Sequence, residues 1–177
     1  ASMSPLVALS FIVNEGLLVA THQHETRLWD LSSEEAVGCV PYEKETACYS
    51  FHSPDRKFLY LGMSDGVVKV VNLSSFYFTA YTIKVPGRAA PVVHISQDPR
   101  EPNTMLLGWA DAGIVEWDLT HRKVARSYTL ARLQSLAAVC WHPHGEKFLA
   151  GSADGLLVVV ARKASDRAER FIESLSG

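Results

Sequence analysis

The stretch DAGIVEWDL, residues 111–119, decides the fold, because variants of it recur along the chain. DGVVKVVNL occupies residues 65–73, DGLLVVVAR residues 154–162, and a degenerate copy, QHETRLWDL, residues 23–31. Their starts are separated by steps of 42, 46 and 43 residues, and two copies contain a Trp-Asp dipeptide. This spacing is typical of four-stranded propeller blades.

Between these copies the sequence reads as short strands separated by turns. An apolar run precedes each copy, and a turn signal containing Pro, Gly, Asn or Asp precedes each run. No segment longer than about ten residues shows a helical stripe with capping residues. The remaining segments, residues 36–40, 78–85 and 123–130, are assigned as the first strand of their blades.

The sequence therefore predicts an all-β chain with a WD40-like β-propeller architecture. About four blades of four antiparallel strands are expected over residues 1–163. The expected blades are about 1–31, 36–73, 78–119 and 123–162, followed by a polar C-terminal tail over 164–177 whose composition allows a short helix.

The number of blades leaves three alternatives open. Most propellers contain more blades, and only about ten residues precede the VNEG turn at 13–16, so we expect the first blade to lack its opening strand. The chain is then a portion of a longer propeller, which we favour, or one of two copies that complete one another, or a closed four-bladed ring. An unclosed set of blades leaves bare edges, which favours self-association.

Bulk composition argues against several functional classes. The 177 residues are 47% hydrophobic and 20% charged, with a formal net charge of −2, so neither a nucleic-acid footprint nor a polybasic membrane patch is indicated. The longest apolar runs, such as LLVVVA at 156–161, are far shorter than the roughly 20 residues of a membrane helix. Three widely spaced cysteines fit reduced thiols better than a disulfide framework. We expect a cytoplasmic protein that is at most peripheral to membranes.

The sequence contains no convincing catalytic, cofactor or metal constellation. CWHPHGEK, residues 140–147, holds two histidines and a thiol, but a zinc site needs three or four ligands and no further pair has matching spacing. Its HGEK portion lacks the phosphate-loop pattern and precedes a strand. Asp65, Asp111 and Asp154 recur in turns, where a short acceptor satisfies backbone amides. We therefore expect no enzymatic activity, no cofactor and no metal.

A binding surface on the loops is the remaining functional candidate, because propeller strands hold their loops rigidly. The longest irregular segment is QDPREPN, residues 97–103. Aromatic residues cluster at 76–78, where they either contact a partner or pack on the next blade's outer strand. The HPH turn and the tryptophan just before the Asp111 turn are further candidates. The candidate partner-contact residues are Phe76, Tyr77, Asp98, Arg100, Glu101, Trp109, His142 and His144.

Four strings of the sequence, in order between about residues 10 and 160, also resemble a known family. They are FIVNEGLLVATHQHETRLWDL, FLYLGMSDGVVKVVNLSSF, PVVHISQDPREPNTMLLGWADAGIVEWDL and VCWHPHGEKFLAGSADG. They resemble successive blades of the first propeller in the tomosyn and lethal giant larvae family. The NEG turn with the following LW pair, and the PVVHIS…PR…LLG segment, are the most specific parts, because propeller geometry alone does not require them.

Members of that family are non-enzymatic regulators of vesicle exocytosis and cell polarity that bind syntaxin-type membrane-fusion proteins. The resemblance therefore implies an interaction scaffold with syntaxin, other SNARE or cytoskeletal partners. It also implies two seven-bladed propellers and, in the tomosyn branch, a SNARE-like coiled coil, whereas this chain has fewer than half of those blades and no heptad segment. The alternative is a WD-repeat adaptor of an unrelated multiprotein complex such as a ubiquitin ligase.

Overall fold

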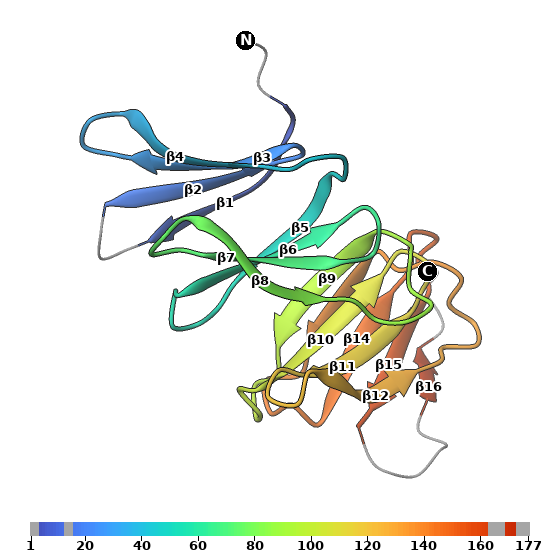
Figure 1. The fold of residues 1–177 in the computed structure, drawn as a ribbon. Coiled ribbons are helices and arrows are strands. Elements are labelled where there is room, and N and C mark those ends of the chain that lie inside the picture. Colours follow the sequence, from blue (N-terminus) through green and yellow to red (C-terminus); the bar gives the residue numbers. More distant parts are fainter. Residues whose placement is uncertain (1–3, 13–15, 163–168, 173–177) are drawn as a thin grey trace. The chain divides into compact units, whose positions relative to one another are not determined.

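The computed structural model describes residues 4–12, 16–162 and 169–172, which form strands joined by turns (Figure 1). The sixteen strands of the described residues make four antiparallel sheets of four strands, each sheet built from consecutive segments. No described residue is helical, so the all-β prediction is confirmed. The chain divides into two compact units, residues 1–92 and 93–177.

The first unit contains sheets 1 and 2. Sheet 1 consists of β1 (Leu6–Ile12), β2 (Leu17–His22), β3 (Glu25–Asp30) and β4 (Glu35–Pro41), side by side in that order. Sheet 2 consists of β5 (Ala47–His52), β6 (Phe58–Met63), β7 (Val68–Asn72) and β8 (Tyr77–Ile83), again in chain order.

The second unit contains sheets 3 and 4, and the division falls at the first residue of β9. Sheet 3 consists of β9 (Val92–Gln97), β10 (Thr104–Trp109), β11 (Ile114–Asp118) and β12 (Lys123–Tyr128). Sheet 4 consists of β13 (Ala138–Trp141), β14 (Lys147–Gly151), β15 (Leu157–Ala161) and β16 (Glu169–Ile172).

The strands predicted to open each blade instead complete the preceding sheet. β4, β8 and β12 pair antiparallel with β3, β7 and β11, respectively, so the assignment of residues 36–40, 78–85 and 123–130 as first strands was wrong. The reason lies in the short turns before them. Such turns return the chain antiparallel to the strand just completed, and recurrence along the sequence does not reveal which neighbour a strand pairs with.

Both ends of the chain also differ from expectation. β1 pairs with β2 through six residue pairs and corresponds to β5 of sheet 2, and β4 completes sheet 1 with a fourth strand. Sheet 1 therefore has all four strands although no equivalent of residues 36–40 precedes β1 among the described residues. At the other end, β16 pairs with β15, so residues 169–172 form a strand rather than a helix or an unstructured tail. Residues 164–168 and 173–177 of the expected tail lie outside the described residues.

Alternation along the described strands builds a hydrophobic core in each unit. In the first unit, Val19 and Leu28 of sheet 1 pack with Leu59, Leu61 and other buried residues of sheet 2. In the second unit, Phe148 is fully buried and contacts the rings of Tyr128 and Trp141 edge-on, with centroids 5.0 and 5.5 Å away. The contact with Tyr128 of β12 joins sheet 3 to sheet 4, whereas Trp141 and Phe148 are paired residues within sheet 4.

The turns of different sheets repeat the same hydrogen bonds. Asp30, Asn72 and Asp118 each end the third strand of a sheet, and the Oδ1 atom of each accepts the amides two and three residues on. These bonds close the turn to the fourth strand and give a physical reason for the aspartate of the Trp-Asp dipeptide. Asp65 and Asp111 accept the amides of Val67 and Gly113, which confirms the turn role predicted for these two aspartates.

The residue that closes each repeated motif is held at an equivalent place. The amide of Leu31 donates to the carbonyl of Gly16, that of Leu73 to Lys57 and that of Leu119 to Asn103, over 2.8 to 3.0 Å. In sheet 4 the amide of Arg162 donates to Glu146 over 3.0 Å. A charged residue therefore stands where the other three copies have leucine, and its side chain organises the site described next.

Candidate functional site

Arg162 lies among three carboxylates, one from β11 and two from the loop that follows β9. Its Nη1 is 2.5 Å from Asp98 Oδ2, its Nε is 3.1 Å from Glu116 Oε1, and its Nη2 is 3.4 Å from Glu101 Oε2. The side chains of Asp98 and Glu116 are 0% and 2% exposed, and that of Arg162 is 10% exposed. These charges are largely removed from water, so each depends on the others for compensation.

Electrostatics and aromatic packing hold the guanidinium in place. Burial lowers the pKa of Arg162, but the carboxylates of Glu116, Asp98 and Glu101 outweigh burial and raise that pKa above its ordinary value. The guanidinium carbon also lies 5.5 Å from the ring centre of Trp141, within cation–π range. Arg162 therefore remains charged and is anchored from both sheets of the second unit.

The carboxylates are themselves fixed by further hydrogen bonds. Asp98 Oδ1 accepts the amides of Arg100 and Glu101, at 2.8 and 3.3 Å, which shapes the loop that follows β9. Glu116 accepts a hydrogen bond from the Tyr128 hydroxyl. Burial, together with the nearby Glu116 carboxylate, raises the pKa of Tyr128, so this hydroxyl keeps its proton and continues to donate.

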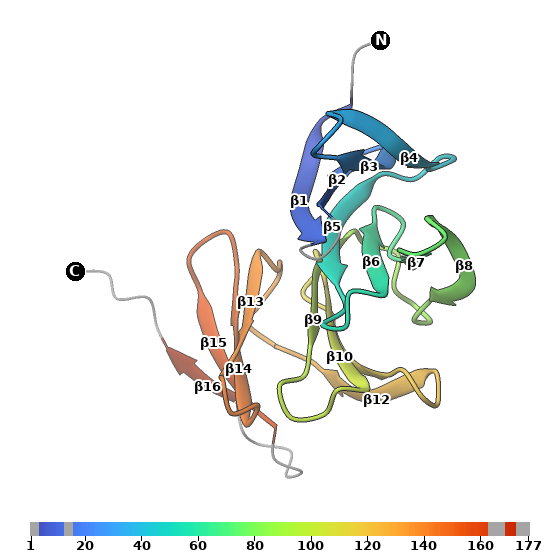
Figure 2. The same cartoon turned by 90° about the vertical axis from the view of Figure 1, so that its left-hand side faces the viewer.

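The loop at 98–103 and the turn at 142–146 lie side by side. Gly145 has a φ of +65°, and a Cβ added there would lie 2.6 Å from Cγ of Arg100. Arg162 bridges both segments, since its amide binds Glu146 while its side chain pairs with Asp98 and Glu101. Figure 2 shows the β9–β10 and β13–β14 turns at the same, lower end of the two sheets.

These two segments present one set of polar side chains, which we call the loop patch. It consists of exposed Arg100, Glu101 and His144 and half-buried His142. The imidazole rings of His142 and His144 are 5.3 Å apart, and the amide of His144 donates to Nδ1 of His142 over 3.2 Å. The loop patch therefore combines four of the eight predicted contact residues on a buried, charged base.

Three predicted contact residues are placed elsewhere than expected. Trp109 is 0% exposed at the end of β10, so its assignment as an exposed contact was wrong. Asp98 is buried beneath the loop patch, where it pairs with Arg162 and not with a partner. Phe76 is 8% exposed, and its Cδ1 is 2.8 Å from the Cβ that a side chain at Gly38 would have, so Phe76 packs within the first unit.

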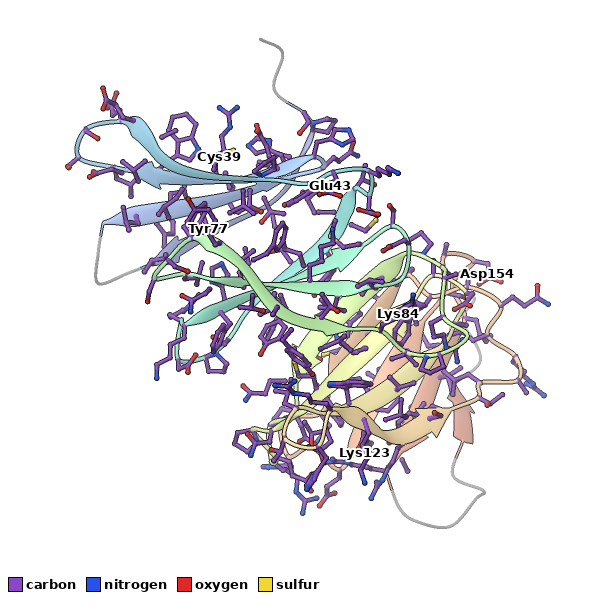
Figure 3. All side chains as sticks on the ribbon, viewed as in Figure 1. Cys39, Glu43, Tyr77, Lys84, Lys123 and Asp154 are labelled. Carbon is purple, nitrogen blue, oxygen red and sulfur yellow. The ribbon has the colours of Figure 1, made fainter. Side chains whose placement is uncertain are left out.

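Tyr77 is the exposed member of the predicted aromatic cluster. It begins β8 with 72% of its surface exposed, the largest value among the exposed large hydrophobic residues of the described chain (Figure 3). It belongs to the first unit, whereas the loop patch belongs to the second. The two are therefore described as separate candidate contact points.

The described residues offer no alternative built from metal ligands. No group of three or more His, Cys, Asp or Glu residues in the described ranges is arranged to hold a metal ion. The described residues also contain no helix that is long and apolar enough to cross a membrane. The three carboxylates around Arg162 are occupied by its guanidinium.

Arg162, Glu116 and Tyr128 are the site residues that sequence reasoning missed. A signal for Arg162 was present, because it is the one charged residue at the position where the other three copies end in leucine. Glu116 gave a weaker signal as a carboxylate between the apolar residues Val115 and Trp117 of β11. No known protein-family model matches the chain.

Proposed function

We propose that the chain is part of a WD40-like β-propeller that acts as a non-enzymatic protein-interaction scaffold. Support comes from four consecutive four-stranded sheets whose turns share equivalent hydrogen bonds. The observation on which the proposal depends is the loop patch. Its exposed polar side chains stand on two loops that the buried Arg162 network holds together.

Rigid loops favour binding for a physical reason. A loop that is already ordered loses less conformational entropy when a partner binds, so more of the interaction energy appears as affinity. The bonds from Asp98 to the amides of Arg100 and Glu101 order this loop before any partner arrives. Arginine is also among the residues most often found at binding hot spots.

The charges of the loop patch suggest the kind of partner. Arg100 and Glu101 are adjacent, exposed and opposite in charge. The loop patch therefore selects a partner by the order of positive and negative groups on the partner's surface more than by the partner's net charge. Such contacts fix the register of a partner surface and act most strongly at low ionic strength. A charged, elongated protein segment meets these requirements.

We infer a syntaxin-type SNARE protein as that partner, with a role in regulating SNARE-dependent vesicle exocytosis or cell polarity. The support is the resemblance of the four strings to the tomosyn and lethal giant larvae family. The segments PVVHISQDPRE and CWHPHG belong to the strings that carry the resemblance, and they supply the loop patch.

The test is calorimetric titration of the chain with the cytoplasmic region of a syntaxin-type protein. Reversing one charge in the loop patch, Arg100→Glu, should raise the Kd about ten-fold or more. The matched control is Lys123→Glu, which makes the same charge change at an exposed position of β12 outside the loop patch. We expect the control to change the Kd less than about two-fold.

Each outcome has a defined meaning. Equal weakening by both variants would attribute binding to net charge and contradict a role for the loop patch. Absence of binding by the unsubstituted chain would remove syntaxin-type proteins as the partner. Binding that Arg100→Glu leaves unchanged would remove the loop patch as the contact surface.

A further inference from the structure

One face of sheet 1 carries an exposed apolar stripe. Leu6, Leu9 and Phe11 are 51%, 57% and 58% exposed. A bulge between Leu6 and Ala8 places all three opposite alternate residues of β2, so they share one face of the sheet. Half-buried Leu18 and Trp29, which pair with each other, extend this face across β2 and β3. We call the surface of Leu6, Leu9, Phe11, Leu18 and Trp29 the N-face.

The equivalent face of sheet 2 is covered. Sheet 2 has the same bulge, between Ala47 and Tyr49, so Leu6, Leu9 and Phe11 correspond to Ala47, Ser50 and His52. Ala47 lies in the core shared with sheet 1, and His52 hydrogen bonds to Ser10 of β1. In sheet 2, this face therefore packs on the sheet that precedes it.

Sheet 4 has an exposed apolar surface on its opposite side. Leu149 and Leu157 are 41% and 43% exposed, and Ala138, Cys140 and half-buried Val159 share their face through the pairing of β13, β14 and β15. The other side of sheet 4 holds Phe148 and Val158, which are buried in the core of the second unit. We call the surface of Ala138, Cys140, Leu149, Leu157 and Val159 the C-face.

The C-face corresponds to the covered side of sheet 1. The pair Cys140–Leu149 lies one step before the last pair of its hairpin, Trp141–Phe148. The amide that closes the repeated motif donates to Gly16 in sheet 1 and to Glu146 in sheet 4, so Val19, three residues after Gly16, corresponds to Leu149. The pair Ser10–Val19 therefore corresponds to Cys140–Leu149. Val19 is 0% exposed because it packs against sheet 2, the sheet that follows.

The two exposed faces are therefore complementary. Between sheets 1 and 2, the side of sheet 1 that corresponds to the C-face packs on the side of sheet 2 that corresponds to the N-face. The chain also presents an exposed surface of each type, the N-face on sheet 1 and the C-face on sheet 4. These two faces hold five of the eight exposed large hydrophobic residues among the described part of the chain. Contiguous exposed apolar residues of this kind mark interaction surfaces.

We propose that the chain binds a second copy of itself, with the C-face of one copy packed on the N-face of the other. The occupant is chosen because this chain supplies both surfaces in the pairing already used inside the first unit. The contact is heterologous, since each copy contributes a different surface. This inference is independent of the proposed partner and of the loop patch.

The test is sedimentation equilibrium of the full chain over a wide range of concentration. We expect a mass of at least twice 19.5 kDa that falls on dilution. Leu9→Glu with Phe11→Glu blocks the N-face, and Leu149→Glu with Leu157→Glu blocks the C-face. Each double variant should lower the association constant about ten-fold or more, while Tyr77→Glu, an exposed aromatic position outside both faces, should leave it unchanged.

Mixing the two double variants is the sharpest part of the test. Each retains one intact face, so together they should form a dimer that neither forms alone. A wild-type chain that stays at 19.5 kDa, or a mixture that does not associate, would overturn the proposal.

A second readout covers the event that a charged variant does not fold. In the single variant Leu9→Cys, a short bismaleimide should join residue 9 of one copy to native Cys140 of the other, because both positions are exposed. Mass spectrometry of peptides identifies the bond. Absence of this cross-link in a folded Leu9→Cys chain would also contradict the proposed contact.

Discussion

Replacing Arg162 by leucine restores the residue that the other three copies have at this position, yet it should destabilise the protein. The change leaves the carboxylates of Asp98 and Glu116, 0% and 2% exposed, without their positive partner. Breaking a buried ion pair in this way costs about 3–5 kcal/mol. Asp98 keeps two backbone amides and Glu116 keeps the Tyr128 hydroxyl, so we expect the lower end, about 3 kcal/mol.

Equilibrium unfolding in urea at neutral pH measures this cost. A loss of about 3 kcal/mol corresponds to an unfolding constant about a hundredfold larger. The control, Lys123→Leu, removes an exposed positive charge and should change the free energy of unfolding by less than about 0.5 kcal/mol. Adding Asp98→Asn to Arg162→Leu removes one uncompensated charge and should recover about 1–2 kcal/mol.

Two results would refute this reasoning. If Arg162→Leu is as stable as the Lys123→Leu control, the network makes no net contribution to folding. If Asp98→Asn destabilises the Arg162→Leu background further, the uncompensated carboxylate is not the cause of the loss.

Three further predictions concern burial. Trp109→Ala should lower the free energy of unfolding by about 3–5 kcal/mol, because Trp109 is 0% exposed. Tyr77→Ala should lower it by less than about 0.5 kcal/mol, because Tyr77 is 72% exposed. Equal losses for the two variants in urea unfolding would contradict both placements. Gly62→Ala should cost about 1–3 kcal/mol in the same assay, because its Cβ would lie 2.7 Å from Val92 Cγ1, and a neutral effect would disprove that close contact. Burial lowers the pKa of His94 to about 4. Below pH 6.5 the unfolded chain therefore binds a proton that folded His94 does not, and the free energy of unfolding falls as the pH is lowered towards 4, by about 3 kcal/mol at most. Unfolding of His94→Asn over this range should depend less on pH, and an unchanged dependence would show that other groups cause it.

The positions of the strands could be predicted because their signals are local. The copies that begin at residues 23, 65, 111 and 154 each contain a third strand, and the apolar runs before them contain the second strands. The turn role of Asp65 and Asp111 followed in the same way, since an aspartate accepts the amide two residues on without help from distant parts of the chain.

The candidate site was predicted only in part. Arg100, Glu101 and His144 were recognised as polar residues of loops, and they are exposed. Asp98 in the same loop is buried, because its partner Arg162 lies sixty-four positions further along the chain and no local pattern joins them. Trp109 likewise stands beside a turn that favours exposure, but the packing of other segments buries it completely.

Strand content, turn chemistry and the repeat of about 43 residues follow from the order of amino acids, because side-chain alternation and turn hydrogen bonds act between near neighbours. Tertiary structure alone placed residues 36–40, 78–85 and 123–130 in the preceding sheets. It also enclosed Arg162 with Asp98 and Glu116, and left the N-face and C-face exposed. Which strand pairs with which, and which face is covered, depends on contacts between distant segments, and their free energies are not encoded in any single stretch of sequence.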